Sequence, residues 1–81
     1  MLDRAEIEKG VIAIVENITG CADVKLTHNL ITNLAADSLD SVEIILDTEE
    51  QFGICLAENE CDEVETVQDL VDLVCKKLQI T

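Results

Sequence analysis

The sequence has no proline, tryptophan or tyrosine, and it has only one phenylalanine, one histidine and three glycines. With so few aromatic side chains it lacks a platform on which nucleic-acid bases could stack. Basic residues are also scarce, because five Lys and Arg stand against 18 Asp and Glu, a formal net charge of −13. This charge repels nucleic acids and anionic membranes. We therefore expect protein partners with basic surfaces, no nucleic-acid partner and no membrane insertion.

Long apolar runs are missing as well. No run approaches the roughly 20 residues that a membrane span needs, and the N-terminus lacks the layout of a signal peptide. At 81 residues, the chain has the length of one small domain, which we expect to span residues 1–81. Its hydrophobic residues are nearly all aliphatic, so the core must be built by packed Leu, Ile, Val, Ala and Cys. We expect a cytoplasmic monomer.

The chain has four cysteines, at positions 21, 55, 61 and 75. They could form two disulfides in an oxidising compartment, but a reducing cytosol argues against this. A zinc site would need closer pairs than Cys55 and Cys61. We interpret the cysteines as small buried hydrophobic residues and expect no metal site.

Apolar spacing of three and four residues predicts amphipathic helices. The first runs from Asp3 to about Asn17, and the second from about Ser38 to Phe52, where Gly53 is suited to the left-handed position after a helix. Thr66-Val67-Gln68-Asp69 resembles a capping box and opens a last helix with Lys76 and Lys77 in its final turn. Glu58–Val64 has room for a turn or two of helix.

Periodicity fails between Thr19 and Ala36. We interpret this stretch as a long loop held to the core by five apolar anchors: Val24, Leu26, Leu30, Ile31 and Leu34. The predicted fold is all-α, a small four-helix bundle with three main helices, one short helix and a long loop between the first two.

The common catalytic motifs are absent. The chain contains no G-x-G-x-x-G, no G-x-x-x-x-G-K-[ST] and no H-E-x-x-H. Its single histidine, His28, falls in the long loop, where an ordinary loop histidine explains it better than a Cys–His pair. The sequence does not predict an enzyme.

The predicted second helix carries a line of acids, hereafter the acidic stripe: Asp40, Glu43, Asp47 and Glu50. At about 100° per residue these four positions share one narrow face, while Leu39, Val42, Ile45, Leu46 and Phe52 fall on a broad opposing arc. Like charges at this spacing weaken a helix. Either the acidic stripe serves a partner, or a chain with 18 acids simply shows an acidic face.

Ser38 lies at the start of this helix, and Asp37 or Ser38 is expected to cap it. The free N–H groups and the dipole of a helix N-terminus favour an anion, so a phosphodiester on the Ser38 hydroxyl would be well placed. Capping rules alone favour a plain N-cap serine.

Asp37-Ser38-Leu39-Asp40-Ser41-Val42-Glu43 resembles the attachment motif of the acyl carrier protein family, D-S-L-(D)-x-V-E. The likeness extends over nearly the whole chain. It implies that a phosphopantetheinyl transferase moves 4′-phosphopantetheine from coenzyme A onto Ser38, flanked by Asp37 and Leu39. The arm would carry acyl groups as thioesters to enzymes of fatty acid or specialised acyl and polyketide biosynthesis. The resemblance also implies a partner surface: Asp40, Glu43, Ile44, Asp47 and Glu50.

The chain departs from the family pattern at three positions. Ala35 replaces a common glycine, Thr48 an aliphatic residue that commonly lines the acyl cavity, and Asp47 a small apolar residue. We therefore expect a smaller or more polar cavity and a short or polar cargo. Two alternatives remain, a D-alanyl or aminoacyl carrier and an acidic helical adaptor without a prosthetic group. Peptidyl carriers fit less well, because their motif lacks these acids.

Overall fold

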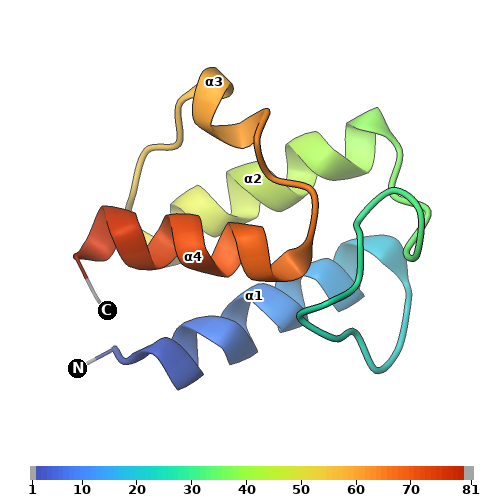
Figure 1. Cartoon of the computed structure of the whole chain (residues 1–81), viewed down its shortest axis with the longest axis horizontal. Coiled ribbons are helices and arrows are strands. Elements are labelled where there is room, and N and C mark those ends of the chain that lie inside the picture. The colour runs from blue at the N-terminus through green and yellow to red at the C-terminus, as the bar shows by residue number, and fades with distance from the viewer. Residues whose placement is uncertain (1, 80–81) are drawn as a thin grey trace.

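The structure is a computed structural model that describes residues 2–79. Its helices are α1 (Arg4–Thr19), α2 (Ser38–Phe52), α3 (Glu58–Cys61) and α4 (Val67–Leu78). Figure 1 shows that the three long helices lie side by side and that α1 runs opposite to α2 and α4. The described residues form no strand beyond one isolated bridge between Asn29 and Thr66. The predicted all-α fold with three main helices and one short helix is confirmed.

The core is aliphatic, and α1 lies at its centre, in contact with both α4 and α2. From α1 it takes Ile7, Val11, Ile14 and Val15, and from α4 it takes Val67, Leu70, Val71, Val74 and Cys75. Each set recurs at three- and four-residue spacing, so each helix turns one apolar side inward. Burial of this surface is the main favourable term in folding a chain of this size.

Gly10 has a packing role that the sequence does not reveal. A Cβ atom at this position would lie 2.9 Å from Cζ of Phe52 and 2.7 Å from Nε2 of Gln51. The glycine therefore lets the C-terminal turn of α2 approach α1 closely, which offsets its low helix propensity.

The loop between α1 and α2 is held by apolar anchors, as predicted, with one exception. Val24, Leu30 and Leu34 are buried and Leu26 is half-buried, but Ile31 is 58% exposed. The prediction for Ile31 is wrong because Oδ1 of Asn29 accepts hydrogen bonds from the N–H groups of Ile31 and Thr32, at 2.9 and 3.0 Å. This local turn directs Ile31 to the solvent.

The same loop completes the start of α4. The carbonyl of His28 accepts from the N–H of Val67 at 3.1 Å, and the carbonyl of Leu26 accepts from the N–H of Gln68 at 2.9 Å. These two N–H groups belong to the first turn of a helix and have no intrahelical partner. Nδ1 of His28 accepts from the N–H of Lys25 at 3.0 Å. His28 is thus an ordinary loop histidine with a structural role, as predicted.

Helix boundaries follow the predicted caps. Thr66 caps α4 and forms a capping box with Asp69, and Gly53 ends α2 with a φ of 64°. α3 is shorter than the predicted Glu58–Val64, because it ends at Cys61.

All four cysteines are free. Cys75 is buried and Cys21 and Cys61 are half-buried, but Cys55 is exposed, so the prediction of burial is wrong for Cys55. Cys55 lies in the irregular connection after Gly53, outside the helices. Among residues 2–79, no group of three or more His, Cys, Asp and Glu side chains is arranged to hold a metal ion.

Candidate modification site and partner surface

Ser38 is the first residue of α2, and its side chain is exposed. The cap of the helix is Asp37, whose Oδ1 accepts from the N–H of Asp40 at 2.8 Å, while Oδ2 of Asp40 accepts from the N–H of Asp37 at 3.4 Å. Because these two carboxylates form the capping box, the hydroxyl of Ser38 is not needed as a cap. It remains open to the solvent at the helix N-terminus.

The backbone before Ser38 is firmly placed. Ala35 has a φ of 55°, in the left-handed region that favours glycine. The next residue, Ala36, is buried and donates its N–H to the carbonyl of Leu30 at 2.9 Å. The turn thus fixes one side of Ser38 to the core while the Ser38 side chain points outward. It also explains why a glycine would suit position 35.

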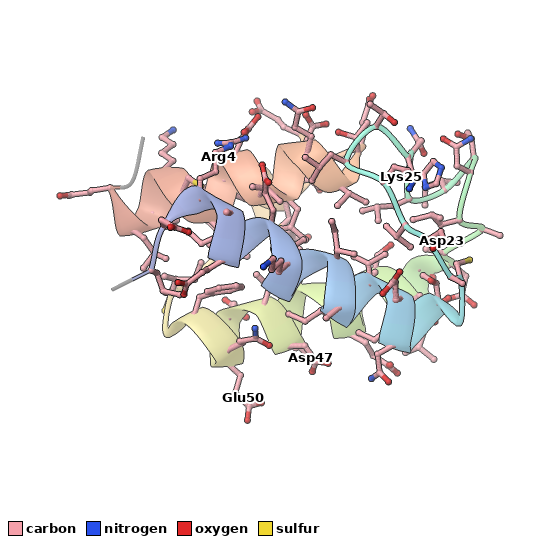
Figure 2. The ribbon with its side chains drawn as sticks, turned by 90° about the horizontal axis from the view of Figure 1, so that it is seen from below. Arg4, Asp23, Lys25, Asp47 and Glu50 are labelled. Atoms are coloured by element: carbon pink, nitrogen blue, oxygen red, sulfur yellow. The ribbon has the colours of Figure 1, made fainter. Side chains whose placement is uncertain are left out.

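The acidic stripe faces the solvent. Glu43, Asp47 and Glu50 are exposed, and Asp40 is half-buried because it also bonds to Asp37. Figure 2 shows Asp47 and Glu50 on the outer edge of α2, pointing away from the other helices. None of the three ion pairs within residues 2–79 involves the acidic stripe. Its negative charge is therefore available to a basic surface.

The apolar arc of α2 is divided between the core and the solvent, because Ile45 and Phe52 pack half-buried against the core and the other three residues are exposed. Leu39, Val42 and Leu46 are 65, 53 and 56% exposed. The buried residues of α2 are Ile44 and Thr48, with Ser41, Ile45 and Phe52 half-buried around them. On the helix, the exposed apolar residues lie beside the acidic stripe. Hereafter we call them the apolar strip.

Ile44 must be corrected, because the sequence placed it among the partner contacts. It is 1% exposed and lies in the core, so it has no surface to offer a partner. The apolar positions that are exposed beside the acids are Val42 and Leu46, which the sequence analysis did not include among the candidate partner residues. The signal that could have identified them is their three-to-four-residue spacing from Leu39 on the outward side.

Thr48 is fully buried, and its Oγ1 donates to the carbonyl of Ile44 at 2.7 Å. The hydroxyl is thus satisfied within its own helix. An adjacent groove of about 460 Å³ runs between α2 and α3, and Thr48 does not line it. Apolar lining residues include Leu30, Val42, Ile44, Leu56, Cys61 and Val64, and polar ones are Ser41, Glu58 and Asp62. The sequence led us to expect that Thr48 would make the groove polar. Its polarity comes instead from the residues at its rim.

The groove lies close to the head of α2. Ser41, which helps to line it, is one helical turn after Ser38. Ser38 and Ser41 are the only serines in the chain, and Ser38 is the exposed one. An all-helical fold that presents one serine at a capped helix start, beside an apolar groove, has the design of a carrier domain that works through a covalently attached arm.

Comparison with known proteins gives the same class. Residues 9–74 match the family model for the phosphopantetheine attachment site. An acyl carrier protein of Thermotoga maritima is 35% identical over 80 residues, which cover 96% of this chain and 99% of that protein. The mitochondrial acyl carrier protein 2 of Arabidopsis thaliana is 34% identical over 80 residues, which cover 96% of this chain and 64% of that longer protein. The chain belongs to the acyl carrier protein family.

The fold agrees with a solved structure. A protein from Mycobacterium tuberculosis that is assigned as an acyl carrier protein superposes with a TM-score of 0.83 at 22% identity, covering 86% of this chain and 96% of that one. At this identity the match concerns the fold alone.

Family membership establishes a carrier and not an enzyme, with a covalently attached 4′-phosphopantetheine group. It overturns the alternative of an adaptor without a prosthetic group. The residues at the head of α2 fit this group, because an unengaged hydroxyl stands where a helix N-terminus favours an anion, and exposure to water screens the nearby carboxylates of Asp37 and Asp40. Acyl carrier proteins interact with phosphopantetheinyl transferases and acyl-processing enzymes. Within residues 2–79, no helix is long and apolar enough to cross a membrane.

Proposed function

We propose that Ser38 carries the phosphopantetheine arm and that the protein delivers acyl groups, held as thioesters on the arm, to enzymes of fatty acid or specialised acyl biosynthesis. The observation that carries the proposal is the exposed Ser38 hydroxyl at the start of α2, which the Asp37–Asp40 capping box leaves unengaged. The arm supplies a flexible thiol. We also propose that residues 1–81 form one monomeric carrier domain that works in the cytoplasm.

The chain's own part in loading is to present one nucleophile. Ser38 Oγ forms the new bond to phosphorus, its proton passes to the transferase, and the adenosine bisphosphate part of coenzyme A leaves. Asp37 holds α2 in register, and Leu39, beside Ser38 and 65% exposed, offers an apolar contact to the transferase.

The outward side of α2 is the proposed partner surface, with Asp40, Glu43, Asp47 and Glu50 beside the apolar strip. Charge on this side steers encounter with a basic partner and fixes its orientation more than it adds affinity. Exposed apolar residues that are rimmed by charge are typical of an interaction site. Such a surface suits a shuttle, which must also be released rapidly.

The attachment site is tested by intact mass. The protein is incubated with coenzyme A and a transferase of broad specificity, next to Ser38→Ala and Ser41→Ala. We expect a phosphopantetheine mass gain in the wild type and in Ser41→Ala, and none in Ser38→Ala. A gain that survives Ser38→Ala would overturn the assignment, and Ser41→Ala controls for loss of a hydroxyl from the same helix.

The partner surface is tested by kinetics. Asp47→Asn with Glu50→Gln should lower kcat/KM for modification by about two- to tenfold at low salt, because steering weakens, and the loss should shrink at high salt. Glu6→Gln with Asp23→Asn removes the same charge from exposed positions outside α2 and is the matched control. Equal losses in both pairs would mean that only net charge matters and would overturn the proposed surface.

A further inference from the structure

The segment around α3, hereafter the α3 segment (residues 57–64), hangs between two anchors. Before it, the N–H of Leu56 donates to Oε2 of Glu49 on α2 at 2.8 Å. After it, the carbonyl of Glu65 accepts from the N–H of Leu30 in the long loop at 3.0 Å. Both anchors tie the chain to other elements of the fold. The eight residues between these anchors are the part of the chain whose contacts with the rest of the fold are considered next.

The backbone of the α3 segment bonds only to itself within the described residues. Its N–H groups donate to carbonyls of the same segment, for example Cys61 to Ala57 at 3.0 Å and Val64 to Cys61 at 3.0 Å. α3 has no buried residue, and the contacts of the α3 segment with the core come mainly from the half-buried Cys61 and Val64. Figure 1 shows α3 standing apart from the three long helices, at the end of two extended connections. Such a segment has little to prevent it from opening locally.

One ion pair joins the α3 segment to the rest of the described chain. Nζ of Lys77 on α4 lies 2.7 Å from Oε1 of Glu60. The side chains are 31 and 23% exposed, so the contact is partly shielded. Lys77 also lowers the pKa of Glu60, chiefly through this hydrogen bond. The other acids of the segment, Glu58, Asp62 and Glu63, have no ion pair in residues 2–79.

The α3 segment forms one wall of the groove described above. Cys61 and Val64 line it opposite Val42 and Ile44 of α2, and Glu58 and Asp62 line its rim. The width of the groove therefore depends on where this segment sits. The acids of the segment and those of α2 carry like charges, so their repulsion, although screened by water, weakly favours an outward position.

We propose that Lys77 is a positioning residue: its ion pair with Glu60 ties the α3 segment to α4 and so keeps this wall of the groove in place, and loss of the pair opens the groove. This concerns access to the groove and goes beyond the proposed function. A basic group of a docked partner can take Glu60 from Lys77 and thereby release the segment. That this opening gives an acyl group on the arm access to the groove rests on the proposed function.

The test is amide hydrogen exchange, followed by NMR on the unmodified protein. Lys77→Gln should accelerate exchange of the amides of the α3 segment by about two- to fivefold, as expected for a partly exposed pair, and leave α1 and α4 unchanged. Lys76→Gln is the control for the direct contact, because Lys76 precedes Lys77 in the same last turn, is exposed and acts on Glu60 through its charge alone, without an ion pair in residues 2–79. Lys77→Arg keeps the charge and should keep wild-type exchange. Variants of Glu60 are less suitable, since its Oε1 also accepts from the N–H of Ala57.

Two results would overturn the proposal. In one, Lys77→Gln and Lys76→Gln exchange alike across the α3 segment. In the other, the acceleration spreads evenly over α1 and α4, which would mean a general loss of stability. Neither result depends on Ser38. If Ser38 is modified but Lys77→Gln causes no local change in exchange, the proposed function holds and the positioning role fails. If exchange changes locally but Ser38 is not modified, the positioning role holds and the proposed function fails.

Discussion

α4 and α2 are similar in length but use their side chains in opposite ways. α4 buries five of its 12 residues, whereas α2 buries two of its 15 and leaves three large apolar side chains exposed. α4 ends with Lys76 and Lys77, which suit the negative end of the helix dipole, while α2 has no basic residue in its last turn. This difference indicates that α4 contributes mainly to the stability of the fold, whereas α2 places many of its side chains where a partner can contact them.

Both helices nevertheless begin in the same way. Asp37 and Thr66 are extended N-caps, and each forms a capping box with an aspartate three residues later. The difference between the helices therefore does not lie in how they start but in which side each turns to the core. Four experiments can break or sharpen this comparison.

The largest expected effect comes from truncating the same residue type in the two helices. Leu70→Ala removes a fully buried side chain from α4 and should lower the free energy of unfolding by about 2–5 kcal/mol. Leu46→Ala removes one that is 56% exposed on α2 and should cost about 0.5 kcal/mol or less. Urea denaturation measures both. Comparable losses would break the comparison.

The two caps should separate stability from function. Thr66→Ala and Asp37→Ala each remove the acceptor of one helical N–H and should each cost about 1 kcal/mol in urea denaturation. Only Asp37→Ala should also slow modification by the transferase, because Asp37 adjoins the proposed attachment residue. Equal rates of modification in the two variants would show that Asp37 acts as a cap alone.

A smaller effect is expected from pH. The pKa of Asp69 is lowered below its ordinary value because its carboxylate accepts from the N–H of Glu65, at 3.0 Å, and of Thr66, at 3.1 Å. The ionised form therefore adds stability at neutral pH, and this is lost as the pH falls below about 3.9 and through the folded pKa. Asp69→Asn should cost about 0.5 kcal/mol at pH 7, since solvent partly screens this half-buried group, and much less once Asp69 is protonated. An NMR titration that finds an ordinary pKa for Asp69 would contradict this.

The smallest effects are expected where the chain enters α2 and leaves α4. Ala35 and Gln79 have φ values of 55 and 59°, a conformation that costs most residues energy. Ala35→Gly and Gln79→Gly should each stabilise by a few tenths of a kcal/mol, because relief of this strain is partly offset by the freedom of glycine in the unfolded chain. Thermal denaturation would detect it, and a lower melting temperature for either variant would show that the position is unstrained.

Local signals in the sequence predicted most of the fold. The bounds of α2 followed from Ser38 and Gly53, and the start of α4 from Thr66 and Asp69, because caps are short-range chemistry. The loop anchors also followed from apolar residues among polar ones. The prediction that Ile31 is buried was wrong because a side chain two positions away, Asn29, bonds to the backbone and changes the direction of the turn.

The orientation of α2 could not be predicted in the same way. Apolar residues cover most of its circumference, so periodicity alone could not say whether Ile44 or Leu46 faces the core, and the packing of α2 on the rest of the fold decides it. The role of Gly10 against Phe52 and the ion pair of Lys77 with Glu60 also join distant parts of the chain. The motif predicted Ser38 as the attachment residue, which remains a proposal, whereas the exposed side of α2 around it could be described only from the structure.

Locating the added mass tests the central claim most directly. The protein is loaded by a transferase with octanoyl-coenzyme A, digested and sequenced by fragmentation. We predict the octanoyl-phosphopantetheine mass on Ser38, with Ser41 and the exposed Cys55 unmodified. Mass on Ser41, on a cysteine or on no residue at all would contradict the account of α2 as the helix that presents the arm.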